Sequence, residues 1–166
     1  MLDSILHLSS INIYDNKGRL IQTQSENITG GLDVTTTQYS WAGWPLVTVQ
    51  KQQFKKGTTS ETTVVVTKMT YDDLGRLVKT EMKESSSLLN NGSMSAFTTI
   101  SELAYDALGQ VTEKKLGKRR NSATAYTTTP LETQKYDYNI RGWLLGVNRD
   151  YVNDVSSTNT TATVGV

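Results

Sequence analysis

The sequence has no cysteine, two prolines and a single histidine, His7, among its 166 residues. The absence of cysteine excludes disulfide scaffolds, thiolate zinc sites and cysteine nucleophiles. One histidine is too few for a multi-histidine metal centre and leaves little choice of general base. We therefore expect no metal and no cofactor, and we assign His7 no role.

The sequence also lacks an excess of charge of either sign, with 17 Lys and Arg residues against 16 Asp and Glu. A net charge of +1 argues against nucleic acid or an acidic membrane surface as the main partner. No run approaches the roughly 20 apolar residues that span a bilayer. Residues 1–14 have no basic region of the kind that opens a signal peptide. The sequence thus predicts neither a membrane span nor a signal peptide.

Small hydroxyl residues are abundant instead, with 25 Thr and 15 Ser, whereas only 36% of the residues are apolar. Threonine is β-branched and fits well on a pleated surface that is exposed to water. The composition favours β-strands, in a sheet that is wetted on one face or that requires neighbours.

A tyrosine followed four residues later by a glycine occurs five times, and the glycines are spaced by 25, 32, 34 and 33 residues. Five of the eight tyrosines occupy this one position. The motif residues are Tyr14, Asp15 and Gly18; Tyr39 and Gly43; Tyr71, Asp72 and Gly75; Tyr105, Asp106 and Gly109; and Tyr138 and Gly142. Such a period indicates an array of equivalent supersecondary units.

Each repeat has the pattern of a β-hairpin. The tyrosine ends a Thr-rich or apolar run and an alternating run follows the glycine, as expected for two strands. Aspartate favours the first position of a type I turn, and glycine favours the fourth, where φ is often positive. The sequence predicts an all-β fold, an antiparallel meander of about ten strands with little or no helix. Ser40 and Asn139 replace the aspartate in repeats two and five, which leaves their turn type open.

Polar segments separate the predicted hairpins. Residues 84–96 and 117–130 predict loops, residues 55–60 a shorter loop, and Gly30-Gly31 a turn. We predict that the hairpin array covers residues 1–151. Residues 152–166 are predicted to be a polar tail or the start of another repeat.

The repeated pattern Tyr-Asp-x-x-Gly-[Arg/Gln]-[Leu/Val] resembles the YD repeat of the Rhs family, over roughly residues 10–150. The phrase YDYNIRGWLLGVN (136–148) is similar to the form of this repeat in large surface or secreted proteins of Bacteroidetes-like bacteria. In this family, hairpins join edge to edge into a sheet that spirals into a hollow shell, as in toxin-complex cocoons, polymorphic toxins and teneurins. The self-cleaving segment of the toxins uses an Asp-Pro-x-Gly context that does not occur here, so autoproteolysis is not carried over.

The resemblance implies an extracellular or cell-surface location in the parent protein. It implies that neighbouring repeats of the same parent chain are partners, and that the further partner is either an enclosed C-terminal effector or a surface glycan. From the residues themselves, the exposed edges of an open hairpin array predict that the isolated chain self-associates through edge strands.

The motif aspartates Asp15, Asp72 and Asp106 recur with a structural period, whereas an active site is normally built once. We interpret them as turn-forming residues and predict that the chain is not an enzyme. The motif tyrosines are interpreted as cross-strand ladders or as packing on the sheet face. A sugar-stacking platform is the alternative.

Three tryptophans lie beside motif glycines: Trp41, Trp44 and Trp143. Packing is the main interpretation, and a carbohydrate or protein contact is the alternative. A basic run, interpreted as a solvated loop and strand end, comprises Lys114, Lys115, Lys118, Arg119 and Arg120. The sequence therefore predicts a non-enzymatic structural region, part of an encapsulating or surface-displayed β-shell. A module that binds carbohydrate or a cell-surface partner is the alternative function.

Overall fold

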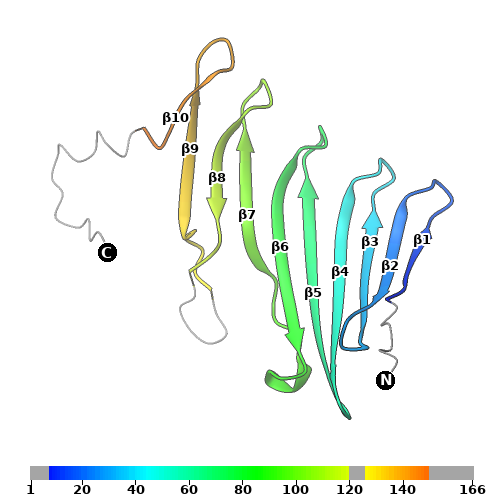
Figure 1. The fold of residues 1–166 in the computed structure, drawn as a ribbon. Coiled ribbons are helices and arrows are strands. Elements are labelled where there is room, and N and C mark those ends of the chain that lie inside the picture. Colours follow the sequence, from blue (N-terminus) through cyan, green and yellow to red (C-terminus); the bar gives the residue numbers. More distant parts are fainter. Residues whose placement is uncertain (1–7, 120–125, 150–166) are drawn as a thin grey trace, which may run out of the picture. The chain divides into compact units, whose positions relative to one another are not determined.

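The computed structural model describes residues 8–119 and 126–149, which form ten β-strands (Figure 1). The predicted all-β hairpin meander is confirmed, because within each of its two units the strands pair antiparallel with their chain neighbours. The chain divides into two compact units after Ile100. His7, Arg120 and the predicted tail at 152–166 lie outside the described residues.

The first unit contains six strands, each antiparallel to the next. They are β1 (Ser10–Tyr14), β2 (Leu20–Glu26), β3 (Leu32–Tyr39), β4 (Pro45–Lys56), β5 (Thr59–Tyr71) and β6 (Leu77–Ser86). A single 3-10 turn, η1 (Asn90–Gly92), follows β6. The hairpins β1–β2, β3–β4 and β5–β6 each contain one copy of the sequence motif, and we call them motif hairpins.

The second unit holds the other two motif hairpins, β7–β8 and β9–β10. Its strands are β7 (Thr98–Tyr105), β8 (Val111–Leu116), β9 (Glu132–Tyr138) and β10 (Leu144–Val147). Strands β8 and β9 also pair antiparallel, and they join the two hairpins.

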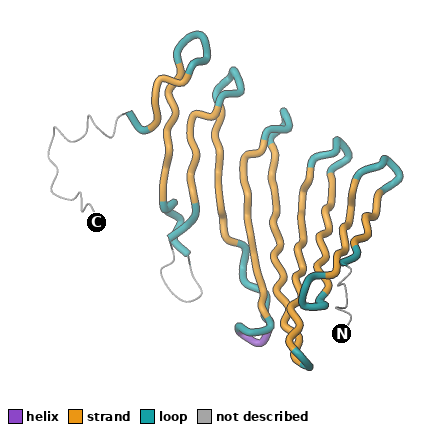
Figure 2. The backbone as a smooth tube through the Cα atoms, viewed as in Figure 1, coloured by secondary structure: helices purple, strands orange, loops and turns teal. Residues whose placement is uncertain are grey.

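The connections at the other end of the strands vary widely (Figure 2). Between β2 and β3 lies a turn from Asn27 to Gly31, with the predicted Gly30-Gly31 at its end. Strands β4 and β5 are separated only by Gly57 and Thr58, so the loop predicted at 55–60 is a tight turn and most of that segment is strand. Segments of different length follow β6 and β8. The unequal spacing of the motif glycines reflects strand length as well as these connections, because β4 and β5 are longer than β2 and β3 although the turn between them is shorter.

The sheet has no hydrophobic core in the residues that the structure describes, since no apolar side chain there is buried. The register of β4 and β5 shows how the two faces differ. Val49 opposes Val66 on one face, and Thr48 opposes Thr67 on the other. Since no apolar side chain of these residues is buried, both faces retain contact with water, whereas the composition favoured a sheet wetted on one face or one that requires neighbours. None of the described residues belongs to a helix long and apolar enough to cross a membrane.

Candidate functional site

The five motif hairpins close through the same pair of backbone hydrogen bonds. In β1–β2, the Gly18 N–H donates to the Asp15 carbonyl oxygen (3.0 Å), and the Asp15 N–H donates to the Arg19 carbonyl oxygen (2.9 Å). Gly18 has a φ of 76°, in the left-handed region. This is the hairpin loop in which a type I turn is followed by a glycine that forms a G1 bulge.

Repeats two and five make this turn too, although they lack the aspartate. The Gly43 N–H donates to the Ser40 carbonyl oxygen (3.1 Å), and the Gly142 N–H donates to that of Asn139 (2.9 Å). Their side chains replace the carboxylate: Ser40 Oγ accepts from the Trp44 N–H (3.0 Å), and Asn139 Oδ1 accepts from the Trp143 N–H (2.9 Å). The turn therefore requires an acceptor oxygen at its first position and not a negative charge.

Two of the aspartates add an ion pair to the turn. Arg19 Nε lies 2.6 Å from Asp15 Oδ2, and Arg76 Nε lies 2.7 Å from Asp72 Oδ2. Hydrogen bonds from the backbone amides of Arg19 and Arg76 are the main reason that the pKa values of these carboxyls fall below 3.8. Both carboxylates are engaged in holding the turn, which is a structural role.

A second irregularity follows each turn and was not predicted from the sequence. Tyr14 opposes Leu20, but the next pair is Ile13 with Gln22, so Ile21 is passed over in the register. The third residue after the glycine is passed over in all five motif hairpins: Ile21, Leu46, Val78, Thr112 and Leu145. An extra residue of this kind is a β-bulge, which bends the strand and increases its twist beside the tyrosine.

Three of the motif tyrosines connect their hairpin to the preceding one. The hydroxyl group of each donates to the carbonyl oxygen of the second residue after the preceding motif glycine. The pairs are Tyr39 with Leu20 (3.1 Å), Tyr71 with Pro45 (2.9 Å) and Tyr138 with Val111 (3.1 Å). Desolvation raises the pKa of Tyr71 above 10.0, which keeps this donor protonated.

The rings of Tyr39 and Tyr71 pack on residues of the hairpin before them. The aromatic pair that the structure describes in the first unit is Tyr71 with Trp44, whose ring centroids are 5.5 Å apart at a tilt of 31°. The Arg19 guanidinium lies over the Tyr39 ring, 5.1 Å from its centroid. Of the two interpretations, ladder or packing on the sheet face, these contacts favour packing.

The residue directly after the motif glycine makes the reciprocal contact, toward the following hairpin. Arg19 Nη1 donates to the Ser40 carbonyl oxygen (2.9 Å), and Gln110 Nε2 donates to that of Gly142 (3.3 Å). Trp44 lies directly over Gly75, where an added Cβ would collide with the indole ring. An arginine, a glutamine and a tryptophan at this motif position therefore each contact the turn of the following hairpin.

The register between hairpins is also constant within each unit. The fourth residue after the glycine opposes the residue three before the next motif tyrosine. The pairs are Gln22 with Thr36, Val47 with Lys68, and Glu113 with Lys135. We call the combination of this register, the tyrosine contact and the contact from the residue after the glycine a joint.

The three tryptophans have different environments. Trp44 packs in a joint and is 37% exposed. Trp41 is 89% exposed at the tip of its turn, with Lys17 Nζ 3.4 Å from its ring centroid. Trp143, which follows the last motif glycine as Trp44 follows Gly43, is 66% exposed. The packing interpretation thus fits Trp44, whereas the side chains of Trp41 and Trp143 face solvent.

The basic run is partly neutralised by nearby carboxylates. Lys115 Nζ lies 2.9 Å from Glu113 Oε1, and this hydrogen bond raises the pKa of Lys115 above 10.5. Lys118 Nζ donates to the Thr128 carbonyl oxygen (2.9 Å) and lies 3.9 Å from Glu102 Oε2. The Lys118 side chain is only 16% exposed, so this part of the run is less solvated than the predicted solvated loop and strand end.

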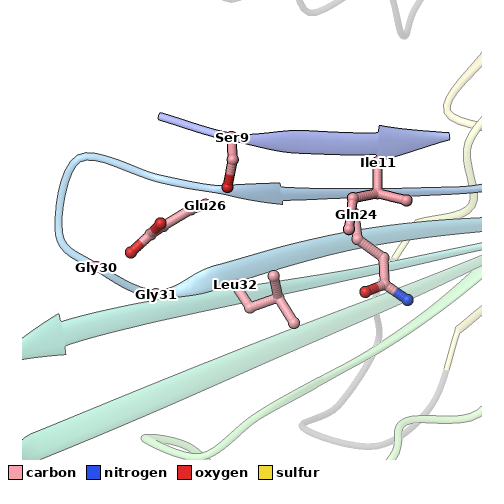
Figure 3. Close-up of a pocket in the computed structure, with 7 residues that line it drawn as sticks. All are labelled: Ser9, Ile11, Gln24, Glu26, Gly30, Gly31 and Leu32. Carbon is pink, nitrogen blue, oxygen red and sulfur yellow. The ribbon is translucent and has the colours of Figure 1, made fainter. Parts of the chain in front are cut away.

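One shallow hollow in the first unit, of about 180 Å³, lies beside the Asn27–Gly31 turn (Figure 3). Its lining residues are Ser9, Ile11, Gln24, Glu26, Gly30, Gly31 and Leu32. Glu26 is the one carboxylate that lines it. A larger hollow of about 260 Å³ in the same unit has two carboxylates in its lining, those of Asp33 and Glu61. Among residues 8–119 and 126–149, no group of three or more His, Asp or Glu side chains is placed to hold a metal ion.

Comparison of this chain with protein-family models, with curated proteins and with solved structures gave no match.

Sequence reasoning missed one further turn of the motif type. The Gly30 N–H donates to the Asn27 carbonyl oxygen (2.9 Å), and the Asn27 N–H donates to that of Gly31 (2.9 Å). Asn27 Oδ1 accepts from the Thr29 and Gly31 amides. The sequence contains Asn-x-x-Gly at this turn, but no tyrosine precedes it, so the tyrosine–glycine motif does not include it.

Proposed function

We propose that this chain is a non-enzymatic structural section of an Rhs-type protein, part of an encapsulating or surface-displayed β-shell. The observation that carries the proposal is the repeated joint. In each of the three joints within the two units, the register, the tyrosine hydrogen bond and the contact from the residue after the glycine are equivalent. A unit that specifies its own neighbour in this way propagates a sheet.

The exposure of the sheet supports the same proposal. A single layer without a buried core exposes apolar side chains on both faces, and exposed apolar surface of this extent marks contact with other protein. In a closed wall, further repeats cover the edges and contents or partners cover the inner face. The chain therefore has the features of a wall segment that requires neighbours.

The engagement of the acidic side chains argues against a catalytic alternative. Asp15 and Asp72 each accept several hydrogen bonds inside a turn, and their pKa values are lowered. A general acid at neutral pH needs a raised pKa instead. Their recurrence at equivalent turns fits a structural role.

The test uses the entire reading frame that contains this sequence. The purified protein is imaged by electron microscopy, and its mass is compared under native and denaturing conditions. A hollow particle supports the shell, and a cleaved C-terminal fragment that is released only on denaturation supports enclosure of an effector. An extended particle with a single uncut mass contradicts encapsulation and supports surface display. A compact particle without a β-shell contradicts both forms of the proposal.

The exposed Trp41 favours a second candidate function, a carbohydrate- or cell-surface-binding module. An indole at the tip of a rigid turn can stack on a sugar ring, and the neighbouring Lys17 offers a hydrogen-bond donor. Under this proposal, tryptophan fluorescence changes on titration with glycans, and Trp41→Ala abolishes the change. A response that survives Trp41→Ala contradicts this site.

A further inference from the structure

The two outermost motif hairpins of the described chain carry complementary halves of a joint. Tyr14, in the first hairpin, is 56% exposed, and its hydroxyl group has no hydrogen-bond partner among the described residues. The corresponding hydroxyls of Tyr39, Tyr71 and Tyr138 each donate to a preceding hairpin. The edge of β1 thus presents the tyrosine half of a joint.

The last hairpin presents the other half. Trp143 follows Gly142 directly, at the position from which Trp44 covers Gly75 and packs on Tyr71. Its ring is 66% exposed. Leu144 is the second residue after the glycine, so its carbonyl oxygen corresponds to those of Leu20 and Pro45, which accept tyrosine hydroxyls.

The first hairpin has room for a covering ring. A Cβ added to Gly18 would meet no atom within 4 Å, as at Gly43, whereas one added to Gly75 would collide with Trp44. The space over Gly18 therefore admits an indole ring, and the exposed Tyr14 is what marks this joint as unfilled. We propose that a second copy of this chain docks head to tail, with β10 of one copy pairing antiparallel with β1 of the next and Trp143 covering Gly18.

The constant register makes the proposed interface specific. The fourth and fifth residues after a motif glycine oppose the residues three and four before the next motif tyrosine. Applied to the two ends, Gly146 opposes Ile11 of the next copy, and Val147 opposes Ser10. Such an interface is heterologous, because each copy contributes a different surface, so association continues beyond a dimer unless a ring closes.

The absence of cysteine from the sequence provides a direct test by disulfide trapping. Opposed residues in a β-ladder have Cα atoms about 4.5–5.5 Å apart, within the range that a disulfide spans. Single variants Ser10→Cys and Val147→Cys are mixed and oxidised, and we expect the mixed dimer to exceed either homodimer. Asn12→Cys is the off-register control with Val147→Cys, since it lies two residues along the same face of β1.

Three outcomes overturn the proposal. The first is a predominance of homodimers of the Ser10→Cys variant, which indicates pairing of two β1 edges. The second is equal trapping of the Asn12→Cys control with Val147→Cys. The third is the absence of any trapped dimer at concentrations where circular dichroism shows a folded protein. Each of these leaves the shell proposal to its own test, because that test concerns the full reading frame.

A second measurement keeps the proposal falsifiable without cysteine. In sedimentation of the otherwise unaltered chain, Trp143→Ala is expected to raise the dissociation constant at least about tenfold. Trp41→Ala is the matched control, since it removes an even more exposed indole outside any joint, and it is expected to leave association unchanged. Equal effects of the two substitutions contradict the assigned contact.

Discussion

The two ends of the hairpins use one turn in two different ways. At the motif end, every turn is flanked by a tyrosine and by a passed-over residue, as at Tyr14 and Ile21. The Asn27–Gly31 turn at the opposite end has the same backbone hydrogen bonds, but β2 and β3 keep one register from Gln22 to Glu26 without interruption. The Asn27–Gly31 turn contacts the neighbouring hairpin through its own polar side chains, since Asn27 Nδ2 donates to the Gln53 carbonyl oxygen (2.7 Å) and Thr29 Oγ1 accepts from the Lys55 N–H (3.1 Å). The tyrosine contact and the bulge beside it are therefore specific to the motif end.

The largest expected effect distinguishes glycines at the two ends. Gly75→Ala is expected to lower the free energy of unfolding by about 3 kcal/mol, because a left-handed residue gains a Cβ and the Trp44 ring must move. Gly57→Ala, in the β4–β5 turn, is expected to cost only about 1 kcal/mol, because its φ is also positive but no atom lies within 4 Å. Urea unfolding followed by circular dichroism measures both values.

A double-mutant cycle isolates the contribution of the joint. In a Trp44→Ala background, the cost of Gly75→Ala is expected to fall to about that of Gly57→Ala, since the ring is gone. Equal costs of the two glycine substitutions in the unaltered chain would contradict a special role for the motif end.

A smaller effect is expected from a tyrosine hydroxyl. Tyr71→Phe removes the hydrogen bond to the Pro45 carbonyl oxygen and is expected to cost about 1 kcal/mol. Tyr14→Phe removes a hydroxyl that has no partner within the described residues and is expected to change stability by less than about 0.5 kcal/mol in dilute solution. Thermal unfolding of both variants, at a concentration where the chain is monomeric, tests this difference.

The smallest expected effect concerns the loss of stability at acidic pH. The pKa values of Asp15 and Asp72 are lowered in the folded state, so their contribution to stability is complete above the ordinary value of 3.8. This contribution is lost as the pH falls through the lower folded values. The double variant Asp15→Asn, Asp72→Asn is expected to keep the turns, as Asn139 does, and to lose less stability on acidification.

The control for the acid experiment is Asp73→Asn, which removes the charge of an exposed neighbour that caps no turn. Its stability is expected to follow that of the unaltered chain as the pH is lowered in urea titrations. If the double variant shows the same acid dependence as this control, the turn carboxylates do not contribute through their lowered pKa values.

Much of the fold could be predicted from the sequence because the turns have a strong local chemistry. Tyrosine, an acceptor side chain and glycine at fixed spacing located all five motif hairpins, and the alternating runs located their strands. Local chemistry also explains why Ser40 and Asn139 serve as well as aspartate. Their oxygens accept the same amide hydrogen bonds.

The remaining features depend on contacts between hairpins and could not be predicted from single segments. Trp44 and Trp143 occupy the same motif position, yet only Trp44 has a described hairpin to cover. The residue passed over after each turn has no residue type in common, since it is isoleucine, leucine, valine or threonine. The strand pairings before and after this residue determine its position, and the sequence pattern does not predict those pairings.

The constancy of the joint has a consequence for how such a chain changes over generations. Because each hairpin presents the same two half-contacts, duplication or deletion of one whole repeat in frame leaves every surviving joint with a matching partner. The lengths of the strands and of the connections at the opposite end both vary, so the motif glycines are spaced by 25 to 34 residues while the motif end stays constant. The number of repeats within the gene can therefore change the length of this sheet without any compensating substitution in a core.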